Sequence, residues 1–96
     1  MSAYVLPEVE ILDESAAVSY RTLAASSIAA YGGRYLARAA EAQVVEGPAT
    51  TRKMVIVEFP SMQRLRDWYA SAEYAEALTY RDVALHRRLM FVEGVT

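Results

Sequence analysis

The sequence contains no cysteine and a single histidine, His86, and both scarcities restrict its chemistry. Without a thiol there is no disulfide framework, no thiolate metal site and no cysteine nucleophile. One histidine, without a second at metal-binding spacing, gives a metal centre no support, and we expect none. We expect His86 near the end of the last helix, where a protonated imidazole is favourable.

A net positive charge and long apolar runs are also lacking. Ten Lys and Arg residues stand against twelve Asp and Glu residues, for a net charge of −2, so we expect no nucleic-acid partner. No apolar run approaches the roughly 20 residues needed to cross a bilayer. The first residues include Glu8 and Glu10 and no positively charged segment, unlike a signal peptide. We expect a cytoplasmic protein without membrane contact.

Motifs for covalent or nucleotide chemistry are missing too. There is no GxSxG elbow, no P-loop and no dinucleotide fingerprint. The glycines of "YGGR", residues 31–34, lack the preceding strand and following helix that a phosphate cradle requires. We therefore expect no cofactor.

The length and the hydrophobic content of the chain predict one folded domain. The 96 residues are 54% hydrophobic, enough for one core, and we expect residues 1–96 to form a single domain. Strands are predicted over residues 3–12, 34–45, 53–59 and 88–94, from their apolar alternation and the turn residues between them. Pro7 cannot donate a backbone hydrogen bond, so we expect a bulge there.

Two helical regions separate these strands. Asp13 is a suitable N-cap for the first, and Gly32 and Gly33 end it. Ser61 caps a second helix, and Ser71 caps a further helical piece. The order strand, helix, strand, strand, helix, strand predicts an α+β fold, the ferredoxin-like βαββαβ sandwich.

The two faces of the predicted sheet are expected to be covered in different ways. Helices cover one face in this topology, and we expect them on the side of Val5, Val9, Val57 and Phe59. The other face is also apolar, and exposed apolar patches above roughly a few hundred Å² usually mark interfaces. We therefore expect sheet-to-sheet homodimerisation, with an interface that includes Leu6, Glu8, Glu10, Met54 and Ile56.

Charged residues are predicted on the same uncovered face. Glu8 and Glu10 would lie about 6.6–7 Å apart and repel by roughly 2 kcal/mol, so they need a cation or a proton. If Glu46 pairs with Arg52 across the hairpin, Arg38 lies diagonal to Glu58 on this face, within reach of a salt bridge. The spacing of Arg34 and Arg38 thus predicts that the arginines offset carboxylates on a partly buried sheet.

Several stretches resemble a known bacterial family. "AAYGGRYLAR", "VIVEFPSMQRLRDWYASAEYAEAL" and "RLMFVEG" are similar to the family named domain of unknown function 1330, in the dimeric α/β-barrel superfamily. The resemblance implies a ferredoxin-like homodimer with a cavity between helices and sheet, where relatives in the wider fold act on aromatic or hydrophobic small molecules. The chain departs from the family at Ala39 and Ala40, where relatives tend to have glycines after Arg38.

Two functional hypotheses follow. In the first, the domain binds a small aromatic or anionic compound and acts without a cofactor, with Arg38 as anion anchor and Glu58 as general base or orienting group. Its cavity would be lined by Tyr20, Tyr31, Trp68, Tyr74 and Arg81. In the second, the charges serve assembly, the aromatic residues pack the core, and the protein is a non-catalytic dimeric structural or accessory module. Whether the protein is an enzyme stays open at this point.

Overall fold

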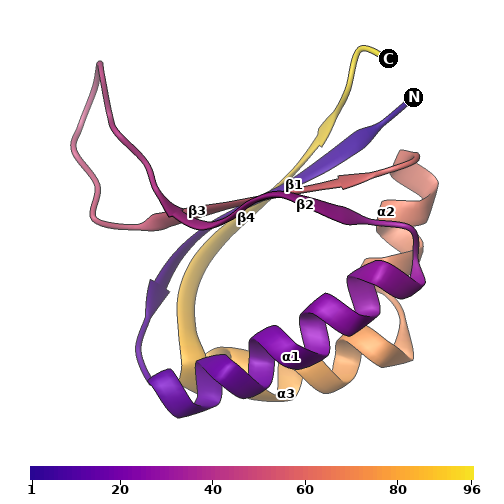
Figure 1. Cartoon of the computed structure of the whole chain (residues 1–96), viewed down its shortest axis with the longest axis horizontal. Helices are drawn as coiled ribbons and strands as arrows, with labels where there is room; N and C mark the ends of the chain where they lie inside the picture. The colour runs from indigo at the N-terminus through magenta and orange to yellow at the C-terminus, as the bar shows by residue number, and fades with distance from the viewer.

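A four-stranded antiparallel sheet has helices on one face only in the computed structural model, which describes all 96 residues (Figure 1). The strand order is β2-β3-β1-β4. This arrangement confirms the predicted ferredoxin-like α+β fold. No helix is long and apolar enough to span a membrane. The elements are β1 (Ala3–Ile11), α1 (Glu14–Ala30), β2 (Arg34–Glu41), β3 (Lys53–Phe59), α2 (Met62–Tyr69), α3 (Ala72–Ala84) and β4 (Leu85–Glu93).

Helix ends follow the predicted residues. Asp13, Ser61 and Ser71 cap α1, α2 and α3, and each side-chain oxygen accepts a backbone N–H of the first turn. Gly32 has a φ of +80° and follows the C-cap of α1. A side chain at Gly33 would collide with the core, since its Cβ would lie 2.7 Å from a side-chain atom of α1.

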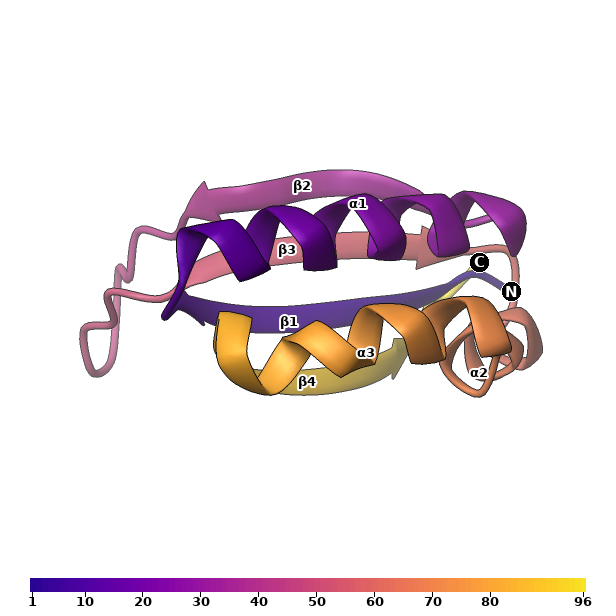
Figure 2. The same ribbon diagram turned by 90° about the horizontal axis from the view of Figure 1, so that it is seen from below.

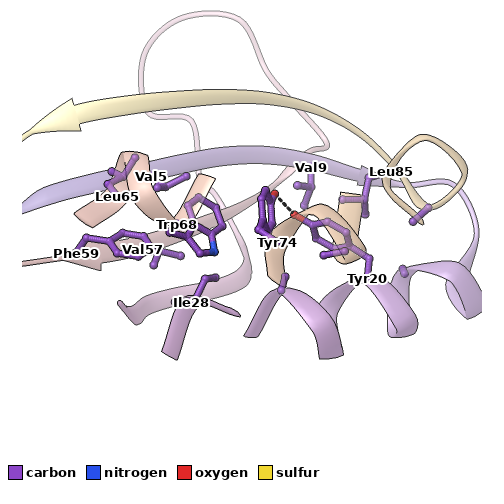
Figure 3. Close-up of a cluster of buried hydrophobic side chains, with 14 of the residues drawn as sticks. Val5, Val9, Tyr20, Ile28, Val57, Phe59, Leu65, Trp68, Tyr74 and Leu85 are labelled. Carbon is purple, nitrogen blue, oxygen red and sulfur yellow. Dashed lines mark hydrogen bonds between the residues drawn. The ribbon is translucent and has the colours of Figure 1, made fainter. Parts of the chain in front are cut away.

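The core lies between the sheet and helices α1 and α3, which run side by side across it (Figure 2). The predicted helix-facing residues of β1 and β3 are buried there, so the assignment of the two faces is confirmed. Figure 3 shows the aromatic centre of this core. The buried residues of the core include Val5, Val57, Phe59, Leu65, Trp68 and Tyr74.

Pro7 is accommodated without the bulge that we predicted. In the β1–β3 pairing, Val5 faces Val57 and Glu8 faces Met54, so the register is unchanged across the proline. Leu6 and Pro7 form no pair with β3, whereas Pro7 pairs with Leu89 of β4. Because proline has no N–H to donate, a gap in one ladder suffices and no residue is inserted.

The irregular strand is β2, which also ends at Glu41 rather than at Val45. Its register with β3 shifts between Tyr35 and Ala37 and again between Ala37 and Ala40. Ala39 has a φ of 49°, in the left-handed region. An inserted residue moves the following side chains to the other face of a sheet, which decides where Arg38 lies.

The last strand begins earlier than predicted. Helix α3 ends at Ala84 and β4 begins at Leu85, so His86 lies in a strand. The prediction that His86 lies near the end of the last helix is wrong. The polar run His86 to Arg88 obscures the strand alternation between residues that face the helices and residues that face away. Leu85 and Arg87 face the helices, and His86 pairs with Glu10 on the uncovered face.

Candidate functional site

A cavity of about 70 Å³ lies between the sheet and the helices. One water molecule needs about 10–15 Å³ of such space, so the cavity admits several waters or one small molecule. Most of its lining is apolar. The lining residues are Val5, Pro7, Val9, Tyr20, Arg21, Ala24, Ile28, Tyr35, Arg38, Ala39, Val55, Val57, Trp68, Leu85, Arg87 and Leu89.

The charged part of the lining has one sign. Arg21, Arg38 and Arg87 contribute guanidinium groups, and no aspartate, glutamate or histidine lines the cavity. Arg21, Arg38 and Ala39 also line a surface groove, so the groove adjoins the cavity. A positive wall in an apolar cavity favours a negatively charged occupant.

A hydrogen-bonded cluster of polar side chains at the site joins three elements. Arg87 of β4 donates from Nη1 to the Tyr20 hydroxyl at 2.6 Å and from Nη2 to the Tyr74 hydroxyl at 2.8 Å. The two hydroxyls, from α1 and α3, are themselves 2.6 Å apart and share a hydrogen bond (Figure 3). Arg87 is half-buried and forms no salt bridge.

Ionisation in this cluster follows from burial. Burial raises the pKa of Tyr20 far above its ordinary value, so its phenol stays protonated at physiological pH. Burial alone would lower the pKa of Arg87, but the tyrosine oxygens outweigh it and the net pKa is raised. The cluster therefore offers a permanent cation and phenolic donors, and no base.

The other arginines at the site are held more loosely. The Arg38 guanidinium stacks on Tyr35, with its Cζ 4.2 Å from the ring centroid. The Arg21 guanidinium lies 3.9 Å from the Glu14 carboxylate, which is a long contact for an ion pair, and both side chains are well exposed. Burial raises the pKa of Tyr35 despite the opposing charge of Arg38. Arg21 and Arg38 are thus available to an anion at the edge of the cavity.

The predicted ligand-binding residues are only partly brought together. Tyr20 and Trp68 line the cavity, and Tyr74 lies behind Tyr20 through their hydrogen bond. Tyr31 does not line it and stacks instead with an arginine of α2. Arg81 lies in an outer groove, where it binds Asp82 at 3.1 Å.

The predicted ion pair between Arg38 and Glu58 is wrong. Glu58 lies on the uncovered face of the sheet, where it accepts from Arg34 Nε at 2.7 Å and from the Tyr4 hydroxyl at 3.1 Å. The Arg34 and Tyr4 hydrogen bonds lower the pKa of Glu58, and the bond to Glu58 raises the pKa of Tyr4. The shift of register in β2 turns Arg38 to the helix side, so the proposed catalytic pair is separated by the sheet.

The uncovered face carries the remaining predicted residues. Glu8 does meet a cation, Arg88 of β4 at 3.3 Å, and Glu10 lies 4.0 Å from the His86 imidazole of the same strand. The apolar residues predicted at an interface are half-buried between these charges. They are Leu6, Met54 and Ile56.

Sequence reasoning missed Arg87. The alternation of Leu85, Arg87, Leu89 and Phe91 along β4 carries the signal, because an arginine in that series must point toward the core. This alternation was not recognised because the prediction extended the last helix into the beginning of β4. No group of three or more possible metal-ligating side chains comes together anywhere in the chain.

The comparison with protein families matches residues 2–95 to the family described as domain of unknown function (DUF1330). The chain belongs to this family. The family resemblance predicted from the sequence is therefore confirmed over almost the whole chain. No curated protein matches it.

Solved structures share the fold. The RPA0582 protein of unknown function from Rhodopseudomonas palustris has a TM-score of 0.80 at 18% identity, covering 99% of this chain and 83% of that one. Rv0793 from Mycobacterium tuberculosis has a TM-score of 0.60 at 14% identity, covering 100% and 97%. A Bacteroides fragilis protein, described as dimeric, of unknown function and ferredoxin-like, has a TM-score of 0.58 at 10% identity, covering 97% and 96%.

Proposed function

We propose that this domain binds a small organic compound carrying negative charge in the cavity between its sheet and its helices. The observation that supports this most directly is the composition of the lining, which is apolar except for arginines and tyrosines and contains no acidic residue. Binding sites for small molecules combine an apolar wall with a few polar groups that orient the ligand. Aromatic walls from Tyr20, Tyr35 and Trp68 suit a flat compound.

The proposal is for binding rather than for proton-transfer chemistry. A general base must lie within hydrogen-bond reach of its substrate, and the lining supplies no carboxylate or imidazole. Glu58, the base considered from the sequence, lies across the sheet with a lowered pKa. The groups present can hold and orient an anion, and the phenols can donate a proton in a hydrogen bond.

A fragment screen by thermal shift and by protein-observed NMR tests this function. We expect small carboxylic acids to raise the melting temperature and to shift the amide resonances of cavity residues in α1 and β4. Arg38→Ala should weaken those hits, whereas Arg66→Ala, an exposed arginine of α2 outside the lining, should not. If no compound perturbs the cavity residues, the binding function is refuted.

A second candidate is a dimeric module without a ligand, favoured by the uncovered face of the sheet. That face exposes apolar side chains between its ion pairs, and Val92 alone is 42% exposed. The dimeric description of the Bacteroides fragilis protein supports pairing of such folds. We propose that this chain forms a homodimer through this face, which is compatible with ligand binding on the opposite side of the sheet.

A further inference from the structure

Arg87, Tyr20 and Tyr74 form a hydrogen-bonded trio. The trio has N–H and O–H donors that its internal hydrogen bonds do not use. A guanidinium has five N–H donors, and Arg87 uses Nη1 on Tyr20 and Nη2 on Tyr74. One phenolic O–H donates to the other phenol, so the second phenolic O–H has no acceptor within the trio. Nε–H of Arg87 donates to no protein atom, and because no fully buried side-chain nitrogen or oxygen lacks a partner, this N–H is open to solvent or to a ligand. The trio therefore lacks protein acceptors for these donors.

The trio is also short of negative charge. The two phenol oxygens, 2.6 Å apart, receive the guanidinium much as the two oxygens of a carboxylate would, but they carry no charge. The acidic residue that shares a groove with Arg87 is Asp82, which binds Arg81 and has a side chain 86% exposed. The phenol oxygens compensate the burial of Arg87 without carrying charge, so an anionic ligand would add a charge-assisted pair that the protein itself does not supply.

The groups around the trio indicate which kind of ligand can supply both hydrogen-bond acceptors and negative charge. Arg87 and Tyr20 line the cavity, so the N–H donors that Arg87 does not use on the phenols are next to its space. Arg21 and Arg38 add positive charge from the edge that adjoins the surface groove. The cavity volume of about 70 Å³ excludes a large ligand such as a nucleotide.

We infer that Arg87, held in place by Tyr20 and Tyr74, is the principal anchor of the site and that the ligand is a small monocarboxylate. This inference rests on the proposed binding function and deepens it. The carboxylate accepts from Arg87 and from the free phenolic O–H, and the apolar remainder of the ligand packs between Tyr35, Trp68 and the valines of the sheet. Arg38 then contributes attraction at the edge rather than the main contact.

The test compares charged and neutral compounds of the same shape. Propionate and propionamide, and the smaller pair acetate and acetamide, are titrated into the ¹⁵N-labelled protein while the arginine Nε–Hε resonances are followed. We expect at least one acid to shift the Arg87 resonance and to bind about tenfold or more tightly than its amide, because hydrogen bonds to charged groups are the stronger ones.

Variants separate the anchor from the rest of the cavity. Arg87→Met should reduce carboxylate affinity by about tenfold or more, and Arg66→Met should leave it unchanged. Should Arg87→Met fail to fold, Tyr74→Phe removes a hydroxyl that holds Arg87 without touching the lining, and it should weaken the acid and not the amide.

Each other outcome overturns the inference. If acid and amide bind equally, or if Arg87→Met binds the acid as well as the natural protein, the charge anchor is refuted while the proposed binding function stands. If only uncharged fragments enter the cavity, the ligand class is wrong and the cavity remains a binding site. If nothing enters it, both proposals fail together.

Discussion

At the scale of single residues, Arg87 combines a half-buried guanidinium with uncharged partners. Its partners are two phenols, and none of the ion pairs of the chain includes it. The balance between these hydrogen bonds and the burial of the guanidinium is measurable in the free protein.

Arg87→Met is expected to change the free energy of unfolding by less than about 2 kcal/mol in either direction, because the loss of two hydrogen bonds to the phenols is offset by no longer burying a guanidinium. The two phenols keep their mutual hydrogen bond. Urea unfolding in a buffer without carboxylates measures this. Arg34→Met is the matched control and should be destabilising, since it leaves Glu58 without its cation. A loss of more than about 2 kcal/mol in Arg87→Met would show that Arg87 is structural.

Ala39 is the second unusual residue, with a φ of 49° beside the cavity. The left-handed conformation costs a residue with a Cβ about 1–2 kcal/mol, and glycine avoids this. Ala39→Gly should therefore stabilise the protein by about 0.5–1 kcal/mol, after the entropy of glycine in the unfolded chain is counted. Ala40→Gly, next in the same strand, should destabilise it. Denaturant midpoints that move in the same direction for both variants would contradict this reading.

At the scale of elements, strand β2 decides which charges meet. Its register shifts place Arg34 opposite Glu58 on the uncovered face and put Arg38 over Tyr35 on the other. Arginines four residues apart share a face in a regular strand, and an inserted residue separates them. One element thus contributes to an ion pair and to the cavity at once.

The pairing of β2 with β3 through Glu58 predicts a pH dependence. Because the folded state lowers the pKa of Glu58, this carboxylate adds stability above its ordinary pKa, and the contribution is lost as pH falls through the lowered value. Glu58→Gln should be less stable than the natural protein near neutral pH, and the difference should shrink below about pH 4. Urea midpoints measured across this range test it.

The background variant Arg34→Gln serves as the control for that experiment. Without Arg34, the hydrogen bond that contributes most to the lowered pKa of Glu58 is gone. The stability difference caused by Glu58→Gln should then be smaller at every pH. A difference between the natural protein and Glu58→Gln that is independent of pH would refute the role of this pair.

At the scale of the whole molecule, the sheet has helices on one face only, and no helix or second sheet covers the other (Figure 1). The uncovered face combines half-buried apolar residues with ion pairs arranged across its strands. A second copy of the chain would cover it while leaving the cavity on the helix side accessible. Assembly and ligand binding are then separable properties.

Ile56→Glu tests the assembly. A carboxylate in the middle of a buried apolar face lacks a partner, so the dimer dissociation constant should rise about a hundredfold or more. Val83→Glu, at an exposed position of α3 that is 62% accessible, should have no effect. Sedimentation velocity at several concentrations measures both. A natural protein that sediments as a monomer at every concentration would refute the dimer.

The sequence by itself determined the elements and their faces, because the signals for these are local. Side chains at Asp13, Ser61 and Ser71 cap helices through their own first turns, and alternation along β1 and β3 marks the side that helices cover. The cavity walls Tyr20 and Trp68 were found in the same way, since their helical stripe points inward.

Only the tertiary structure decided which charged groups meet. The sides of Arg38 and Arg87 depend on a strand register and on a helix end that neighbouring elements set, and a displacement of one residue reverses both. Hydrogen bonds such as Arg87 to Tyr20 join residues far apart in the chain, so no local pattern carries them. The fold was therefore predictable from periodicity, whereas the site was not, because a site is a set of distances between elements.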